Sequence, residues 1–206
     1  HPVLAGDRVR HVGEPIALIV AETLMQARDA AELIECDIDD LPAVATIERA
    51  IAPEAPCLWQ QAPGNVAFHW RSGDLDATER EFAKAAHIAR LDLINNRVVC
   101  NPMEPRTATG AFDGGKDEFT LYLSTQTPHI ERLLLAKATL RAPESKLRVV
   151  SPDVGGGFGT KAQHYPETVL VQRAVRRLGS PVHWAADRSV GFVCDRQARA
   201  HVTHVV

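Results

Sequence analysis

The sequence contains 206 residues, of which 45% are hydrophobic and 24% are charged, and its formal net charge at pH 7 is -3. This composition is ordinary for a soluble globular protein, and the length accommodates one large or two small domains. The charge gives no indication of nucleic-acid binding. Because no apolar run approaches the ~20 residues that a helix needs to cross a bilayer, no membrane span is expected.

The cysteines and histidines are scattered rather than clustered. Neither a Cys-x-x-Cys pair nor a His-Glu-x-x-His motif occurs, so we expect no zinc or iron–sulfur ligation within this chain. Such spacing is typical of reduced thiols in a cytosolic protein, and we expect a cytoplasmic location. The cysteines are Cys36, Cys57, Cys100 and Cys194.

The first 50 residues read as strand, helix, strand. The apolar run Pro15–Val20 is typical of a strand buried on both faces. A helix is predicted after Thr23, because Gln26 occupies the capping-box position. Its expected apolar stripe consists of Leu24, Ala27, Ala31 and Ile34. The segment Cys36–Val44 looks extended and ends this unit.

Residues 51–64 contain three prolines and show little hydrophobic periodicity. Such a segment indicates either a linker between two domains or a long loop within one domain. We take residues 51–70 as a linker between a first domain at 1–50 and a second at 71–206.

The predicted second domain opens with a short helix from Asp76, which has a glutamate three residues later. A strand follows near Ala89–Ile94. A hairpin is expected next, with strands at Thr107–Phe112 and Phe119–Thr125 joined by a turn at Gly114–Gly115. In its later strand, apolar and polar residues alternate.

Helices and strands alternate in the rest of the chain. A helix over Pro128–Leu140 is expected to bury Ile130, Leu133 and Leu134. Strand Leu147–Val150 follows, then a helix over Pro166–Leu178 that ends before Gly179, and then strand Val182–Ala185. The fold class is therefore mixed, α+β or α/β. The sequence stops on an apolar, strand-like run, so we expect it to be a piece of a larger protein.

The segment DVGGGFGTK, residues 153–161, is the most distinctive motif, and we call it the glycine loop. It is not a P-loop, because Thr160 separates Gly159 from Lys161 and alanine follows the lysine. Nor is it a dinucleotide fingerprint, because Thr160 occupies the place of the third glycine. Glycines here either let a ligand press against backbone N–H groups or form a turn without a ligand.

Polar residues elsewhere suggest further contacts. Gln126, at a predicted strand end, could both donate to and accept from a ligand, or could close a local turn. Glu104 and Arg106 could contact substrate or cofactor, or form a structural ion pair. His164 and Tyr165 could line a pocket, or pack at the start of a helix.

Four motifs in this order resemble the large subunit of molybdenum hydroxylases, the superfamily of xanthine dehydrogenase, aldehyde oxidase and carbon monoxide dehydrogenase. They are STQTPH, PDVGGGFGTK, YPE and VHWAADR. The run RVVSPDVGGGFGTK with its following YPE looks closest to carbon monoxide dehydrogenase-type large subunits. The opening run LAGDRVRHVGEPIALIVAETLMQARDAAELIECDIDDLPAV is similar to the end of that family's α/β hammerhead domain. The resemblance implies that part of the molybdenum–pterin-binding domain follows.

The resemblance also implies cofactors and partners. The parent enzyme is expected to bind molybdenum in a molybdopterin cytosine dinucleotide and to oxidise CO, an aldehyde or a heterocycle. Electrons would pass to 2Fe–2S clusters on a small subunit and to FAD on a medium subunit, in a dimer of heterotrimers. The pterin dithiolene holds the metal, which implies no protein ligand to molybdenum.

Five residues of this sequence match the family's site. Gln126 corresponds to the glutamine beside an oxo ligand of the metal. The loop that packs its backbone against the cofactor corresponds to Gly156, Gly157, Phe158 and Gly159, with the aromatic ring near the substrate pocket. The resemblance thus implies catalytic roles for Gln126 and Phe158.

Departures from the family pattern limit these expectations. Xanthine-type members carry a glutamate where this chain has Ala162, which argues against a purine substrate. The substrate loop and the glutamate base would lie beyond Val206, so the isolated chain is expected to be inactive. The alternatives are an excised noncatalytic scaffold domain and an unrelated α/β binding module.

Overall fold

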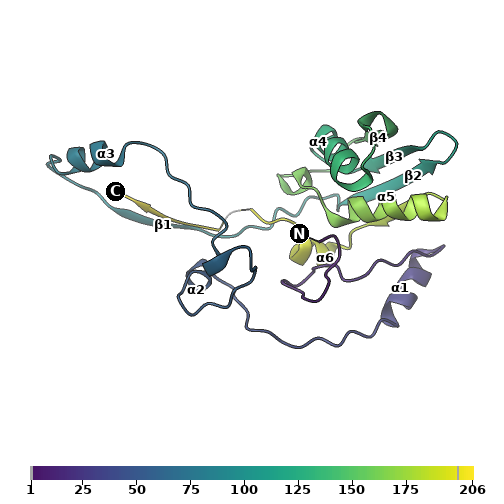
Figure 1. Ribbon diagram of the computed structural model, residues 1–206, viewed down its shortest axis with the longest axis horizontal. Helices are drawn as coiled ribbons and strands as arrows, with labels where there is room; N and C mark the ends of the chain where they lie inside the picture. Colours follow the sequence, from purple (N-terminus) through teal and green to yellow (C-terminus); the bar gives the residue numbers. More distant parts are fainter. Residues whose placement is uncertain (1, 199) are drawn as a thin grey trace. The chain divides into compact units, whose positions relative to one another are not determined.

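A computed structural model describes residues 2–198 and 200–206 (Figure 1). The described chain divides into two compact units. The first comprises residues 2–36 and 98–198, and the second comprises residues 37–97 and 200–206. In the described ranges, no helix is both long and apolar enough to cross a membrane.

The first unit is built on a four-stranded mixed sheet with strand order β4-β3-β2-β5. The strands are β2 (Thr107–Asp113), β3 (Glu118–Leu123), β4 (Leu147–Val150) and β5 (Val182–Ala185). Strands β2 and β3 form the predicted antiparallel hairpin, and β5 pairs antiparallel with the other edge of β2. Strand β4 runs parallel to β3, so both strands end at the same edge of the sheet.

Alternation along β3 places one face of the sheet in the core. Phe119, Leu121 and Leu123 are buried, whereas Tyr122 between them is 51% exposed. This is the pattern of a strand that is covered on one face. The ring of Phe112 in β2 packs on Phe119 with 4.6 Å between ring centroids.

Helix α5 (Pro166–Leu178) packs against β2 as part of this core (Figure 1). It ends as predicted, with Gly179 at φ 66° and its N–H donating to the carbonyl of Val175. The helix approaches the sheet closely at Gly110, where an added Cβ would lie 2.8 Å from Cγ1 of Val171. The buried core consists of Ala108, Phe119, Leu121, Leu123, Leu135, Ala136, Leu147, Val169, Val171, Ala174, Val175 and Val182.

The predicted single helix over residues 128–140 is wrong in part. Helix α4 covers Pro128–Leu134, and a π-helical segment continues over Leu135–Leu140. The expected inner face is also wrong, because Ile130 is 52% exposed and Leu134 is 37% exposed. Glu131 faces inward instead, at 1% exposure, because a nearby histidine satisfies its carboxylate. A buried polar partner has therefore overridden the apolar pattern.

The N-terminal helix α1 (Leu24–Glu32) begins as predicted. Thr23 accepts from the backbone N–H of Gln26, whose side chain accepts from the N–H of Thr23, so both halves of the capping box are present. The predicted apolar stripe is not buried, since Leu24 is 67% exposed.

The strand predicted at Pro15–Val20 is not formed in the described structure. Ile16, Leu18 and Val20 are each about two-fifths exposed, and the described residues give this run no strand ladder. The carbonyl of Pro15 accepts one hydrogen bond, from the backbone N–H of Ala5. A strand requires hydrogen-bonding neighbours, so an apolar run by itself does not make one.

The second unit contains short elements. These are α2 (Ile47–Ala50), the 3₁₀ turn η1 (Pro63–Asn65), α3 (Leu75–Phe82), β1 (Leu91–Asn95) and β6 (His201–Val205). Strands β1 and β6 pair antiparallel as a two-stranded ribbon, exposed along its whole length. The strand predicted near residues 89–94 is confirmed as β1.

Helix α3 begins one residue before the predicted Asp76, because Asp74 caps it by accepting from the N–H of Ala77 at 2.9 Å. The proline-containing segment before it has local order around one side chain. Asn65 accepts from the N–H of Leu58 and donates to the carbonyls of Ala50 and Pro56.

Candidate functional site

Two loops meet at the edge of the sheet where the parallel strands β3 and β4 end. The first, residues 124–127, is here called the glutamine loop, and the second is the glycine loop. Thr125 donates its hydroxyl to the carbonyl of Lys161 at 2.9 Å, and Ser151 donates to the carbonyl of Thr125 at 2.9 Å. The carboxyl edge of parallel strands is where ligands of α/β sheets bind, so this loop pair is the candidate site.

Gln126 lies directly against the glycine loop. Its Oε1 accepts from the backbone N–H of Gly159 at 2.9 Å, and its own N–H donates to the carbonyl of Lys161 at 3.0 Å. A Cβ added to Gly157 would lie 2.5 Å from Cδ of Gln126, so no other residue fits there without displacing the glutamine. Gln126 therefore joins two distant segments rather than closing a local turn. Among the described residues, no partner is found for its Nε2.

The glycine loop also presents free backbone donors. Gly156 and Gly159 have positive φ angles of 94° and 87°, which glycine adopts without strain. Phe158 between them is also left-handed, at φ 51°, a conformation that costs a bulky residue free energy. In the described part of the chain, the N–H groups of Gly157 and Phe158 have no hydrogen-bond acceptor. With Nε2 of Gln126 they make a set of donors at one edge, which suits an acceptor-rich group such as an oxo or phosphate group.

Phe158 is not a core residue, because 71% of it is exposed. Its ring lies over the loop itself, with Cε2 3.1 Å from the position that a Cβ on Gly156 would take. Its carbonyl accepts a weak bond from the thiol of Cys100 at 3.4 Å. The ring is therefore available to a ligand.

We expect Phe158→Ala to change the free energy of unfolding by less than about 0.5 kcal/mol, as an exposed position should. If the ring lines the substrate pocket, the variant should raise KM about tenfold in the full-length protein, because a substrate would lose an aromatic face to pack on. Thermal melts and steady-state kinetics measure both quantities. The matched control is Phe68→Ala, which removes a ring that is 80% exposed in the second unit. A large loss of stability with unchanged KM would contradict this role.

Glu104 and Lys161 hold the two loops together. Oε2 of Glu104 accepts from the hydroxyl of Ser124 at 2.8 Å, the N–H of Gly155 at 2.7 Å and Nζ of Lys161 at 2.8 Å. Burial opposes ionisation, but the bonds from Lys161, Gly155 and Ser124 outweigh it and hold the pKa of Glu104 below its usual value. The charged carboxylate thus stabilises the fold at neutral pH, and this contribution is lost as pH falls through the lowered pKa.

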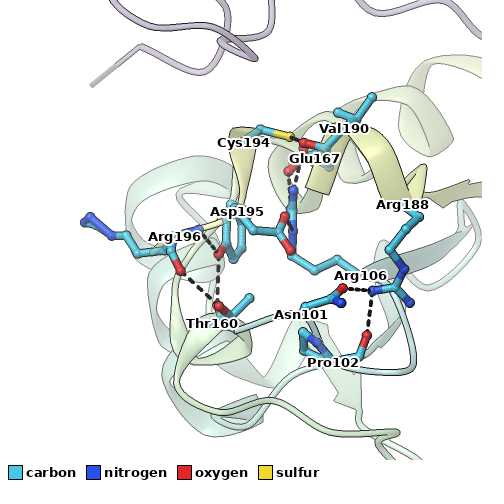
Figure 2. A network of polar contacts seen from close by, with 11 residues as sticks. Asn101, Pro102, Arg106, Thr160, Glu167, Arg188, Val190, Cys194, Asp195 and Arg196 are labelled. Carbon is cyan, nitrogen blue, oxygen red and sulfur yellow. Dashed lines mark hydrogen bonds and ion pairs between the residues drawn. The ribbon is translucent and has the colours of Figure 1, made fainter. Parts of the chain in front are cut away.

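Arg106 does not pair with Glu104. Its guanidinium is buried and forms ion pairs with Glu167 at 2.9 Å and Asp195 at 2.6 Å (Figure 2). It also lies over the ring of Tyr165, 3.7 Å from the ring centroid. Burial by itself would lower the pKa of Arg106. The two carboxylates outweigh this effect, so the pKa of Arg106 lies above its usual value. The predicted ion pair between Glu104 and Arg106 is therefore wrong, because Arg106 pairs with Glu167 and Asp195 and Glu104 pairs with Lys161.

A second arginine holds the segment before Glu104. Arg188, the first residue of helix α6 (Arg188–Cys194), donates to Oδ1 of Asn101 and to the carbonyl of Pro102, each at 2.6 Å (Figure 2). It also donates to the carbonyl of Met103 at 2.6 Å. This cation fixes three successive residues of an irregular segment whose backbone would otherwise lack partners.

His164 and Tyr165 have packing roles at the start of α5. His164 lies 2.6 Å from the buried carboxylate of Glu131. Tyr165 donates its hydroxyl to the carbonyl of Thr160 and accepts from the N–H of Arg196, and burial raises its pKa. Tyr165 also lines a cavity of about 10 Å³, room for about one water molecule.

The sequence singled out Gln126 and the glycine loop, which the structure brings together, but it offered Arg106 instead of Lys161 as the ionic partner of Glu104. The one available signal was the lysine that ends the glycine loop, because a lysine next to such a backbone needs a countercharge. No group of three or more potential ligands that could hold a metal ion is found among the residues that the structure describes. The loop donors do fit a cofactor that brings its own metal.

Family models match the two parts of the chain separately. Residues 58–206 match the molybdopterin cofactor-binding domain, and residues 1–42 match the a/b hammerhead domain of aldehyde oxidase and xanthine dehydrogenase. The chain belongs to the molybdopterin cofactor-binding domain family of molybdenum hydroxylase large subunits. The resemblance read from the sequence motifs and the mixed α/β fold class are both confirmed.

Relatives of this chain are named for different substrates. The chain is 37% identical over 199 residues to the nicotine 6-hydroxylase large subunit of Paenarthrobacter nicotinovorans, covering 96% of this chain and 24% of the relative. It is 35% identical to the carbon monoxide dehydrogenase large chain of Hydrogenophaga pseudoflava, covering 90% and 24%. The chain therefore spans about a quarter of the length of these relatives.

Solved structures share the fold over nearly the whole chain. The reconstituted CO dehydrogenase from Oligotropha carboxidovorans superimposes with a TM-score of 0.90 at 32% identity, covering 97% of this chain and 26% of that one. Quinoline 2-oxidoreductase from Pseudomonas putida 86 gives a TM-score of 0.81 at 34% identity, covering 97% and 25%.

Proposed function

We propose that this chain supplies part of the cofactor cradle of a molybdenum-dependent oxidoreductase. The observation that carries the proposal is the contact between Gln126 and the glycine loop, which gathers three partnerless donors among the described residues at one sheet edge. The residues proposed to hold the cofactor are Gln126, Gly156, Gly157, Phe158 and Gly159. When bound, the molybdenum–pterin group would supply the redox centre at which the substrate is oxidised.

Each residue of the cradle would have a separate task. Nε2 of Gln126 would donate to an acceptor near the metal, while its Oε1 stays on the N–H of Gly159 and fixes the amide. The N–H groups of Gly157 and Phe158 would donate to acceptors of the cofactor. The exposed ring of Phe158 would exclude water and offer an apolar surface to the substrate.

We further propose the cytosine dinucleotide form of the cofactor, with electrons leaving to a 2Fe–2S small subunit and an FAD medium subunit in a dimer of heterotrimers. A cytoplasmic location belongs to the same proposal. The proposal of partner subunits is supported by the relatives, which are large or gamma subunits, one of them in a dehydrogenase complex of Paenarthrobacter nicotinovorans.

The substrate class proposed is CO, an aldehyde or a heterocycle, since relatives are named for carbon monoxide, aldehyde and nicotine. Ala162, where xanthine-type members carry a glutamate, favours substrates other than purines. We also propose that the chain consists of a hammerhead part at residues 1–50, a linker at residues 51–70 and a cofactor-binding part at residues 71–206.

The full-length protein, produced in a host that assembles the cofactor, should contain on the order of one molybdenum atom per subunit, as a single enclosed site requires. Gly157→Val should abolish molybdenum retention, because a side chain there displaces Gln126. Elemental analysis of the purified proteins measures both. The control is Gly6→Val, because an added Cβ at Gly6 meets nothing within 4 Å. Molybdenum-free protein throughout, or full retention in Gly157→Val, would refute the proposed function.

A further inference from the structure

The two loops of the proposed cofactor cradle are joined by one charge pair, Glu104 and Lys161. Nζ of Lys161 lies 2.8 Å from Oε2 of Glu104, and the two side chains are 1% and 32% exposed. Removing the partner of a charged group as deeply buried as Lys161 is strongly destabilising. The carboxylate of Glu104 is that partner.

Both members of the pair also bond the loops by other atoms. The N–H of Glu104 donates to the carbonyl of Gly155 at 3.1 Å, while its carboxylate accepts from the N–H of Gly155. The carbonyl of Lys161 accepts from the N–H of Gln126 and from the hydroxyl of Thr125. Glu104 thus holds the beginning of the glycine loop, and Lys161 holds the glutamine loop.

The fit around the pair is tight. A Cβ on Gly155 would lie 2.6 Å from Cβ of Glu104, so the glutamate stem lies on the loop backbone. Ser124, the first residue after β3, donates the third bond to the same carboxylate oxygen. One donor from the glutamine loop and two from the glycine loop converge on one oxygen atom, which leaves the loops little freedom to move independently.

We propose that Glu104 and Lys161 act as positioning residues, a charge-compensated clamp that fixes the glutamine loop relative to the glycine loop. The clamp sets the spacing between Nε2 of Gln126 and the free N–H groups of the glycine loop without touching a ligand. Its importance for the cofactor rests on the function proposed above. The loop geometry itself does not, and can be measured in protein without cofactor.

The direct test is hydrogen exchange in the full-length protein made without cofactor. Glu104→Gln keeps the side-chain shape but leaves Lys161 without its countercharge. We expect amide hydrogen exchange in residues 154–162 to become faster by about tenfold or more, because the loops open locally. Exchange in the core strand β3 should stay unchanged. The matched control is Glu144→Gln, which removes a carboxylate of similar exposure, 37%, that pairs with Arg132 at 3.4 Å.

Charge compensation is tested by a second variant. Glu104→Gln combined with Lys161→Met removes both charges and should recover part of the lost protection, since no uncompensated ion remains. No recovery in this double variant would overturn the clamp. Unchanged exchange in Glu104→Gln, or an increase shared equally by β3, would overturn it as well.

Molybdenum content of the same variants, made in a competent host, separates this inference from the proposed function. Faster loop exchange with loss of molybdenum supports both. Faster exchange with full molybdenum content and normal kcat supports the clamp but contradicts the assignment of these loops to the cofactor.

Discussion

Gln126→Ala in the cofactor-loaded, full-length protein is expected to lower kcat by about 10²–10³, equivalent to about 2.7–4 kcal/mol in the rate-limiting step. The reason is that Nε2 of Gln126 has no partner among the described residues and is one of the three donors of the proposed cradle, at which charge would change during the reaction. The residue is exposed, so its loss should harm folding little. Steady-state kinetics normalised to molybdenum content provide the measurement.

Two further variants sharpen this test. Gln126→Glu retains an oxygen to accept from the N–H of Gly159 but replaces the donor by an acceptor, so it should be as slow as the alanine variant. Gln61→Ala removes an exposed glutamine of the second unit and should leave kcat unchanged. If either Gln126 variant keeps full turnover at normal metal loading, the glutamine loop is not part of the active site.

Arg106→Met is expected to destabilise the first unit by about 3–5 kcal/mol, the usual cost of removing one partner from a buried ion pair. The side chain of Arg106 is 5% exposed, and those of its partners Glu167 and Asp195 are 17% and 16% exposed. Methionine fills the space over Tyr165 but leaves both carboxylates without a countercharge. Thermal or urea unfolding of the full-length protein, followed by a probe in the first unit, measures the loss.

The matched control for this loss is Arg28→Met. Arg28 lies 3.6 Å from Asp187, and both side chains are about half exposed, so its removal should cost about 0–1 kcal/mol. Arg106→Lys keeps the charge but cannot bond both carboxylates with one planar group. Its loss of unfolding free energy should lie between those of Arg106→Met and Arg28→Met. Equal stability of the Arg106 and Arg28 variants would show that the buried network contributes nothing measurable.

Local patterns in the sequence determined the elements whose neighbours are close along the chain. Alternation and a glycine turn predicted the hairpin of β2 and β3, and a terminal glycine placed the end of α5. The capping box located the start of α1. These signals are reliable because each rests on hydrogen bonds or side-chain periodicity within a few residues. Motif order along the chain likewise identified the family.

Only the tertiary structure decided which partners distant residues have. The sequence places Glu104 two residues from Arg106, yet each pairs with a cation or anion more than fifty residues away. The inward turn of Glu131 in α4 was decided in the same way, by a histidine beyond β4. The apolar run at residues 15–20 forms no strand, because the described chain gives it no ladder. Burial, charge compensation and strand pairing are properties of neighbours in space, and periodicity along a chain does not contain them.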